Sequence, residues 1–430
     1  MTPPRFATRL LAGTALLLGG MNRTWAGEPS GFLSPAKPAF FSLILGSQWV
    51  GGLSDGQPIA ASLADKEPLH EAWRIMGDIG SDIIKISIAK KELEKQVHDA
   101  AECESLTDVV RHPHFRHLFA LPYRVMLLWA HGGRQGWHTT RMTEAQKASL
   151  HKELFDLTRH LLTEYRGTGK TFLIGNWEGD WMAGGQAVGD HSDLEPKRLE
   201  AFQEWLDIRT RAIDEAKASL PSDGVAVYSY LEVNHVTRAR VEGRKRLVNT
   251  VLPRSRVDYV SLSSYEMFGY GRWPQPRNES TIRPLIVATL DYVEKHVPPR
   301  DVPGKRVFVG EIGFTLDEIE RRQKLAPDQA NREQARLALI QAKVSLEWGV
   351  PLWLWWSIFD SNDGTHTFGL IHQATGNRSA LFDELRTYYE WATTYLRQYR
   401  DTHGADPAQS VFREAAVQQL DRQIRRLADR

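Results

Sequence analysis

The chain has 430 residues, of which 42 % are hydrophobic and 25 % are charged, a composition that excludes a disordered or fibrous protein. Lysine and arginine (54) balance aspartate and glutamate (53), so no global charge favours a nucleic-acid partner. The single cysteine, Cys103, excludes an intramolecular disulfide framework and a cysteine-based zinc site.

The N-terminal residues have the pattern of a secretory signal peptide. Arg5 and Arg9 precede an apolar stretch, residues 10–21, and a small-residue cleavage site ends at Ala26. A bilayer span needs about 20 apolar residues, more than this stretch provides. We therefore expect residues 1–26 to be cleaved, leaving a periplasmic or secreted bacterial protein without membrane association. The alternative is that the same stretch remains as a membrane anchor.

Short apolar runs alternate with segments of helical periodicity along the rest of the chain. Eight runs are predicted strands: residues 40–45, 82–88, 123–130, 171–176, 225–231, 257–262, 306–309 and 351–356. Helical spacing of apolar residues recurs at 144–165, 196–218 and 328–348. Eight strands that alternate with helices predict an α/β protein, a (β/α)8 TIM barrel over residues 36–395.

The last segment of the chain, residues 401–430, contains one amphipathic pattern at 407–428. We expect this C-terminal helix to pack on the barrel or to extend from it.

The active site of such a barrel lies at the C-terminal ends of its strands, so the residues after each run are the candidates. Asn176, Trp177, Glu178, Asp180 and Trp181 follow the fourth run. Tryptophan faces suit sugar rings, and they also lower the local dielectric constant. Desolvation raises the pKa of a carboxyl group, as a general acid requires.

A second lone carboxyl group, Glu311, follows the seventh run among apolar residues and glycines. Tyr265 follows the sixth run, where its hydroxyl could bond a carboxylate and keep that group ionised. After the eighth run, alternation sends Trp353 and Trp355 to one face and Trp356 to the other. We expect at least one of these tryptophans to form the floor of the pocket.

Weaker polar candidates lie near the other strand ends: Lys85, His131, Glu232, Asn234 and His235. No HExxH motif is present and the 15 histidines are scattered, so we expect neither a metal nor another cofactor. A nucleophile elbow and a P-loop are also missing from the sequence.

A barrel with one glutamate after strand four and another after strand seven resembles clan A of the glycoside hydrolases. Residues 310–313 are similar to the nucleophile motif of that clan. Residues 263–265 are similar to its strand-six segment, whose tyrosine bonds the nucleophile. The pair Trp355 and Trp356 resembles its strand-eight aromatic, which stacks under the reacting sugar.

This resemblance implies that Glu311 is the nucleophile, Glu178 the acid/base and Tyr265 their partner in catalysis. The clan has asparagine directly before its acid/base, whereas Trp177 separates Asn176 from Glu178. This departure leaves two points open: whether Asn176 contacts the sugar 2-hydroxyl, and whether Glu178 or Asp180 is the acid.

Two carboxyl groups across a barrel mouth could flank a glycosidic bond. A separation of about 5–5.5 Å would give retention and about 6.5–9.5 Å inversion. The resemblance favours a retaining hydrolase of a polysaccharide or oligosaccharide, and the 14 tryptophans suggest several sugar subsites and endo action. The substrate-binding residues expected are Lys85, His131, Asn176, Trp177, Asp180, Trp181, Asn234, Trp355 and Trp356. A transglycosidase and a non-catalytic carbohydrate-binding barrel in polysaccharide export or assembly remain as alternatives.

Overall fold

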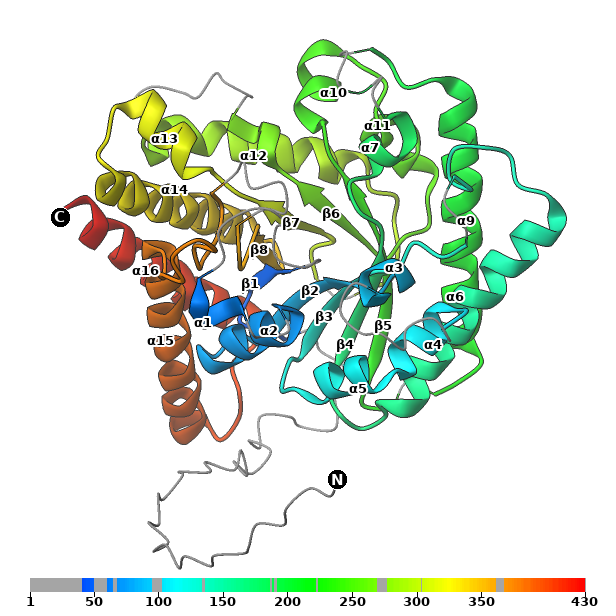
Figure 1. Ribbon diagram of the computed structural model, residues 1–430, viewed down its shortest axis with the longest axis horizontal. Coiled ribbons are helices and arrows are strands. Elements are labelled where there is room, and N and C mark those ends of the chain that lie inside the picture. Colours follow the sequence, from blue (N-terminus) through cyan, green and yellow to red (C-terminus); the bar gives the residue numbers. More distant parts are fainter. Residues whose placement is uncertain are drawn as a thin grey trace, which may run out of the picture. The chain divides into compact units, whose positions relative to one another are not determined.

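The computed structural model in Figure 1 describes most of the chain beyond the N-terminal region. The described residues are 41–49, 60–64, 68–94, 103–133, 136–185, 188, 192–221, 223–268, 277–302, 304–360 and 367–429. The expected signal peptide, residues 1–26, lies outside them. Within the described part, no helix combines the length and the apolar character needed to cross a bilayer.

Eight parallel strands close into a barrel in chain order, with β1 hydrogen-bonded to both β2 and β8. The strands are β1 Leu45–Gln48, β2 Ile83–Ser87, β3 Val125–Trp129, β4 Thr171–Gly175, β5 Ala226–Val233, β6 Tyr259–Ser263, β7 Val307–Ile312 and β8 Trp353–Trp355. The predicted (β/α)8 barrel is therefore confirmed.

Helices surround this barrel (Figure 1), and those predicted from helical spacing are present to within a residue or two. The longer helices are α2 Pro68–Asp78, α6 Glu144–Glu164, α9 Pro196–Ala218, α12 Glu279–His296, α14 Pro327–Trp348, α15 Ala380–His403 and α16 Gln409–Ala428. The shorter ones are α1 Ala61–Ala64, α3 Lys90–Glu94, α4 Leu106–Arg111, α5 Pro113–Ala120, α7 Gly179–Gly184, α10 Val236–Glu242, α11 Leu247–Thr250, η2 Leu252–Arg254, η3 Tyr265–Phe268 and α13 Leu316–Gln323.

The barrel interior is a packed apolar core below the ends of the strands. Its buried side chains come from alternate positions of the strands and their immediate flanks: Ile83, Val125, Leu127, Trp129, Leu173, Tyr230, Tyr259, Phe308, Leu352 and Leu354. Successive residues of a strand point to opposite faces, so the residues two positions further on also face inward. This alternation decides which polar residues reach the mouth of the barrel.

The first strand was predicted at residues 40–45, but β1 begins only at Leu45. Ile44 has a positive φ of 70°, which breaks the extended run. The backbone N–H of Leu43 instead donates to the carboxylate of Asp82, at 3.0 and 3.1 Å. At Gly46 an added Cβ would lie 2.9 Å from the side chain of Ile83, so the close approach of β2 leaves no room for a side chain at this position of β1.

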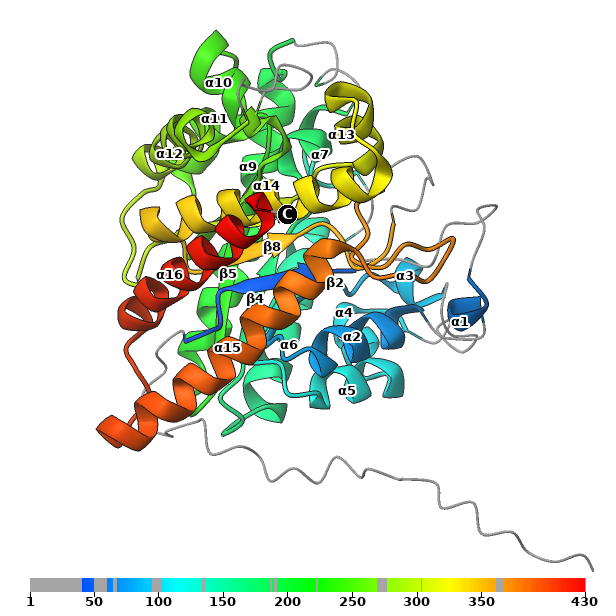
Figure 2. The same cartoon turned by 90° about the vertical axis from the view of Figure 1, so that its left-hand side faces the viewer.

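The two C-terminal helices hold the segment around β1. Gln409, at the start of α16, exchanges hydrogen bonds with the backbone N–H and carbonyl of Ser42, at 2.9 and 3.0 Å. From α15, the hydroxyls of Tyr388 and Tyr389 donate to the carbonyls of Leu43 and Leu45, at 2.8 and 2.9 Å. Figure 2 shows α15 and α16, in orange and red, on this side of the barrel.

Two glycine positions test the packing of the barrel. A Cβ at Gly175, on β4, would lie 2.3–2.4 Å from the ring of Tyr230, whereas one at Gly77, on α2, would lie 3.7 Å from the Tyr123 hydroxyl, its nearest neighbour outside the helix. We expect Gly175→Ala to lower the free energy of unfolding by about 1–3 kcal/mol through overpacking. Gly77→Ala should leave it unchanged or raise it by up to about 1 kcal/mol. Urea unfolding of both variants measures the difference, and equal stabilities would contradict this account of the core.

Candidate active site

A polar layer lies directly above the apolar core at the C-terminal ends of the strands. It follows from alternation: Lys85, Glu232, Ser261, Gly310 and Trp356 each stand two residues after an interior core residue. Lys85, Glu232 and Ser261 are completely buried. The barrel thus brings charged side chains from distant parts of the sequence to one point.

The ammonium group of Lys85 is the centre of this layer. Its Nζ donates to Glu232 Oε2 at 2.6 Å and to the carbonyl of Gly310 at 3.0 Å, and lies 3.4 Å from Glu311 Oε2. It also lies 4.5 Å from the centre of the Trp129 ring. A buried charge is tolerated only when it is paired and hydrogen-bonded, and these acceptors meet that condition.

Glu311 reaches the site through an irregularity in β7. Phe308 faces the interior, so regular alternation would turn Glu311 outward. The register shifts on both sides of β7, towards β6 and towards β8, and Glu311 then pairs with Ser263. Its carboxyl group accepts a hydrogen bond from the hydroxyl of Tyr265 at 3.0 Å. The expected bond from Tyr265 to a carboxyl group is therefore present.

Glu178 lies on the loop after β4, at the same end of the barrel as Glu311. Its Oε1 accepts from the Ser263 hydroxyl at 2.6 Å, and its backbone N–H donates to Glu232 Oε1 at 3.1 Å. Burial raises the pKa of the Glu178 carboxyl to about 7. The hydrogen bond from Ser263 opposes this shift, and the negative charge of Glu232 adds to it.

Burial also raises the pKa of Glu311, although Lys85 and Tyr265 both favour its ionised form. Tyr265 was expected to keep this group ionised; its hydrogen bond lowers the pKa of Glu311, while burial raises it. Among the described residues, Lys85 is the one ammonium group near three carboxyl groups, those of Glu178, Glu232 and Glu311. One positive charge cannot balance three negative charges, so the site favours a proton bound to Glu178 or Glu311. The charged donor lies beside Glu311, whereas Glu178 accepts from a neutral hydroxyl.

Of the three tryptophans in and directly after β8, Trp356 lies on the interior face. It packs against the core and stacks on Trp129, with ring centres 6.2 Å apart. Trp355 is completely buried, stacks on Trp353 and donates its indole N–H to the carbonyl of Phe368 at 2.9 Å. The alternation of the three is as predicted, and Trp355, which was expected to bind substrate, has no exposed surface in this structure.

Trp177 is the exposed aromatic of the site, with 38 % of its surface accessible. Its backbone N–H donates to His131 Nε2 at 3.2 Å. Burial lowers the pKa of His131 to about 3, with a further contribution from Arg209, so the ring is neutral and can accept this bond. Trp181, which is half-buried, packs edge-on against His235 at 5.0 Å. His131 therefore acts here as a support for Trp177.

Asn176, Asp180 and Asn234, also expected to bind substrate, are buried and hydrogen-bonded to backbone groups of the protein. The Asp180 carboxylate accepts the backbone N–H of Leu247 at 2.8 Å and of Asn234 at 3.1 Å, while Asn234 Oδ1 accepts the N–H of Asp180 at 2.9 Å. The fully buried Asn176 bonds to both backbone groups of Glu232, at 3.2 and 3.3 Å. These polar groups join the segments that follow β4 and β5, and both oxygens of the Asp180 carboxylate accept backbone N–H groups.

Trp129, Ser261 and Ser263 belong to the site without a motif that marks them in the sequence. Ser261 donates to Glu232 Oε2 at 2.7 Å, and Ser263 bonds Glu178 as described. All three occupy positions of their strands whose side chains point into the barrel, and this alternating pattern could have identified them in the sequence.

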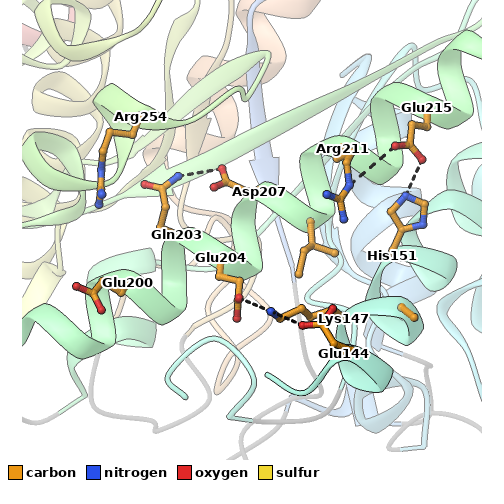
Figure 3. A pocket seen from close by; sticks show the side chains of 12 residues that line it. Glu144, Lys147, His151, Glu200, Gln203, Glu204, Asp207, Arg211, Glu215 and Arg254 are labelled. Atoms are coloured by element: carbon orange, nitrogen blue, oxygen red, sulfur yellow. Dashed lines mark hydrogen bonds and ion pairs between the residues drawn. The ribbon is translucent and has the colours of Figure 1, made fainter. Parts of the chain in front are cut away.

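A cavity of about 870 Å³ lies elsewhere, on the outer surface between α6 and α9 (Figure 3). Its acidic and basic side chains pair with one another, as Lys147 does with Glu144 and Glu204, and His151 with Glu215. None of its lining residues comes from a strand end. Among the described residues, no group of three or more histidine, cysteine, aspartate or glutamate side chains could hold a metal ion.

Neither a protein-family model nor a curated protein sequence matches this chain. Solved structures do. A GH5-4 broad-specificity endoglucanase from Clostridium acetobutylicum is 12 % identical, with a TM-score of 0.50 over 81 % of this chain and 96 % of its own. XEG5A, a GH5 xyloglucan-specific endo-β-1,4-glucanase from a metagenomic library, is 14 % identical, with a TM-score of 0.50 over 82 % of this chain and 97 % of its own. These similarities establish a common fold.

The raised pKa of Glu178 predicts how stability depends on pH. The folded state holds a proton on this group from about pH 4.5 to about pH 7, where the unfolded chain has released it, so stability falls as pH rises through this window. We expect Glu178→Gln to lose less stability than the wild type between pH 5 and pH 8.

Urea unfolding at several pH values measures this difference. Glu144→Gln, at an exposed position of α6, is the matched control and should keep the wild-type dependence. A Glu178→Gln variant with the same pH dependence as the wild type would contradict the raised pKa.

Proposed function

We propose that this protein is an exported, retaining glycoside hydrolase that cleaves a polysaccharide or oligosaccharide within the chain. The observation that carries the proposal is the pair of carboxyl groups, half-buried Glu178 after β4 and buried Glu311 in β7, with different donors on each. Their electrostatic interaction supports a shared role, since each charge disfavours ionisation of the other group.

The donors around the two groups suggest separate roles. Lys85 and Tyr265 both stabilise an ionised Glu311, which would attack the anomeric carbon and form a glycosyl–enzyme ester. Glu178, with its pKa raised to about 7, would protonate the departing glycosidic oxygen. In the second step Glu178 would take a proton from water as the water attacks the ester, which returns both groups to their first state.

Three tryptophans support sugar binding at this site. Trp177 offers an exposed ring beside Glu178, Trp181 is half-buried on α7, and Trp356 reaches the barrel interior above Trp129. Sugar rings present apolar faces that suit such flat surfaces. Export rests on the signal-peptide pattern of residues 1–26, and it would place the enzyme in the periplasm or outside the cell.

Hydrolysis of a panel of polysaccharides tests the proposal. We expect the mature chain, residues 27–430, to release reducing ends from one of them, and Glu311→Gln to lower kcat by on the order of 10³-fold or more. Reducing-end assays at equal protein concentrations give both results. Binding to a polymer without release would instead indicate a carbohydrate-binding barrel, and products longer than the substrate would indicate a transglycosidase.

The leaving group separates the role of Glu178 from that of Glu311. An aryl glycoside with an acidic phenol departs without protonation, so Glu178→Gln should form its glycosyl–enzyme at nearly the wild-type rate. On a polysaccharide the same variant should be about 10²–10⁴-fold slower, because the sugar hydroxyl needs the proton. The burst of phenol release measures the first rate. An equal loss on both substrates would contradict the assignment of Glu178 as the acid.

A further inference from the structure

Glu232 is a third carboxyl group in the site, and the two-carboxylate mechanism does not use it. It is completely buried on β5. Three donors surround it: Lys85 Nζ at 2.6 Å and the Ser261 hydroxyl at 2.7 Å on Oε2, and the backbone N–H of Glu178 at 3.1 Å on Oε1. An ionised carboxylate only accepts hydrogen bonds, so this set of donors fits the charged form.

Each oxygen of Glu232 connects to one member of the proposed catalytic pair. Oε1 fixes the backbone at Glu178, on the loop that follows β4. Oε2 binds Lys85 at 2.6 Å, while the same ammonium lies 3.4 Å from Glu311. Glu232 and Glu311 therefore compete for one positive charge, and Glu232 is the closer of the two.

We propose that Glu232 is a positioning residue that couples the two catalytic carboxyl groups: it orients Glu178 through its amide and determines how much of the charge of Lys85 reaches Glu311. The catalytic roles of this pair rest on the proposed function, whereas the coupling itself is a property of the charges. Glu232 touches neither the reacting atoms nor their protons in this scheme.

The charge of Glu232 acts on both groups in the same direction. It raises the pKa of Glu178, and it raises the pKa of Glu311 directly as well as by holding Lys85. Further groups that act on the pair come from several elements: Lys85 on β2, Asp180 on α7, Ser263 on β6 and Tyr265 on η3. Removing the charge of Glu232 should therefore make both carboxyl groups more acidic.

A titration of the carboxyl groups tests the coupling without any substrate. In full-length protein labelled with ¹³Cδ-glutamate, NMR follows the resonances of Glu178 and Glu311, assigned with Glu178→Gln and Glu311→Gln. In Glu232→Gln we expect both midpoints to fall by about one pH unit or more. Glu232→Asp keeps the charge and should shift them by less than half as much.

The matched control is Asp258→Asn. Asp258 is also a buried, ion-paired carboxylate, but it precedes β6 at the other end of the barrel, where it bonds Ser229 and Arg300. This control should leave both midpoints in place. Unchanged midpoints in Glu232→Gln, or equal shifts in Glu232→Gln and Glu232→Asp, would overturn the proposal.

A second variant keeps the test decisive if Glu232→Gln does not fold. Ser261→Ala removes one donor from Oε2 and leaves Lys85 as its side-chain partner, which draws the ammonium away from Glu311. The midpoint of Glu311 should then rise, and an unchanged midpoint would overturn the proposal.

The pH dependence of kcat/KM gives the catalytic readout in parallel. Both limbs of the profile should move to lower pH in Glu232→Gln, whereas a purely structural role would lower the rate without moving them. A wild-type protein that hydrolyses no substrate would refute the proposed function alone, because the titration still decides the coupling.

Discussion

The ammonium group of Lys85 is completely buried, so the barrel must supply its hydrogen-bond acceptors, and much of the site consists of these acceptors. The acceptors come from β5 and β7, a carboxylate from the first and a carbonyl and a carboxyl group from the second. Strands so far apart in the sequence meet only when the barrel is closed. A single unpaired ion at this depth would cost several kcal/mol, so fold and site depend on one another.

The charged groups around Lys85 also restrict the size of the neighbouring side chains. Gly310 occupies an interior position where a Cβ would lie 1.8 Å from the Ser261 hydroxyl. The missing side chain leaves its carbonyl open to Lys85 and leaves room for Ser261 to bond Glu232. Below this layer the aromatic and aliphatic core excludes water, which strengthens every charge–charge interaction above it.

Much of the fold could be predicted because continuous apolar runs are typical of strands buried on both faces. The exception is instructive. The segment at β1 reads Leu-Gly-Ser-Gln, and it is a strand because its neighbours β2 and β8 supply hydrogen bonds, not because its residues favour one. The apolar residues before it pack instead where Asp82 and the C-terminal helices bind their backbone.

Strand alternation predicts the site only where it is regular, and Glu311 was predicted instead from its isolated charge and its motif. Glu232 stands two residues after Tyr230, so its inward direction follows from the strand pattern. Glu311 has the opposite parity to Phe308, and only the shift in register turns it inward. Asp180 and Glu178 are two residues apart and both carry a carboxyl group, yet the backbone N–H groups that bind Asp180 come from Asn234 and Leu247, partners that no local pattern reveals.

The hydrogen bonds between the C-terminal helices and the segment at β1 affect the order in which the barrel folds. Residues 42 and 409 are joined across almost the whole chain, and Tyr388 and Tyr389 bind the same segment. A chain grows from its N-terminus, so β1 is made first but lacks these partners until the last helices have emerged. Contacts between residues so far apart in sequence cost loop-closure entropy, and they form only after the intervening chain is present. Closure of the barrel between β1 and β8 is therefore a slow step. The open sheet that precedes ring closure exposes two unpaired edges, and the growing chain passes through this aggregation-prone stage before it becomes a barrel.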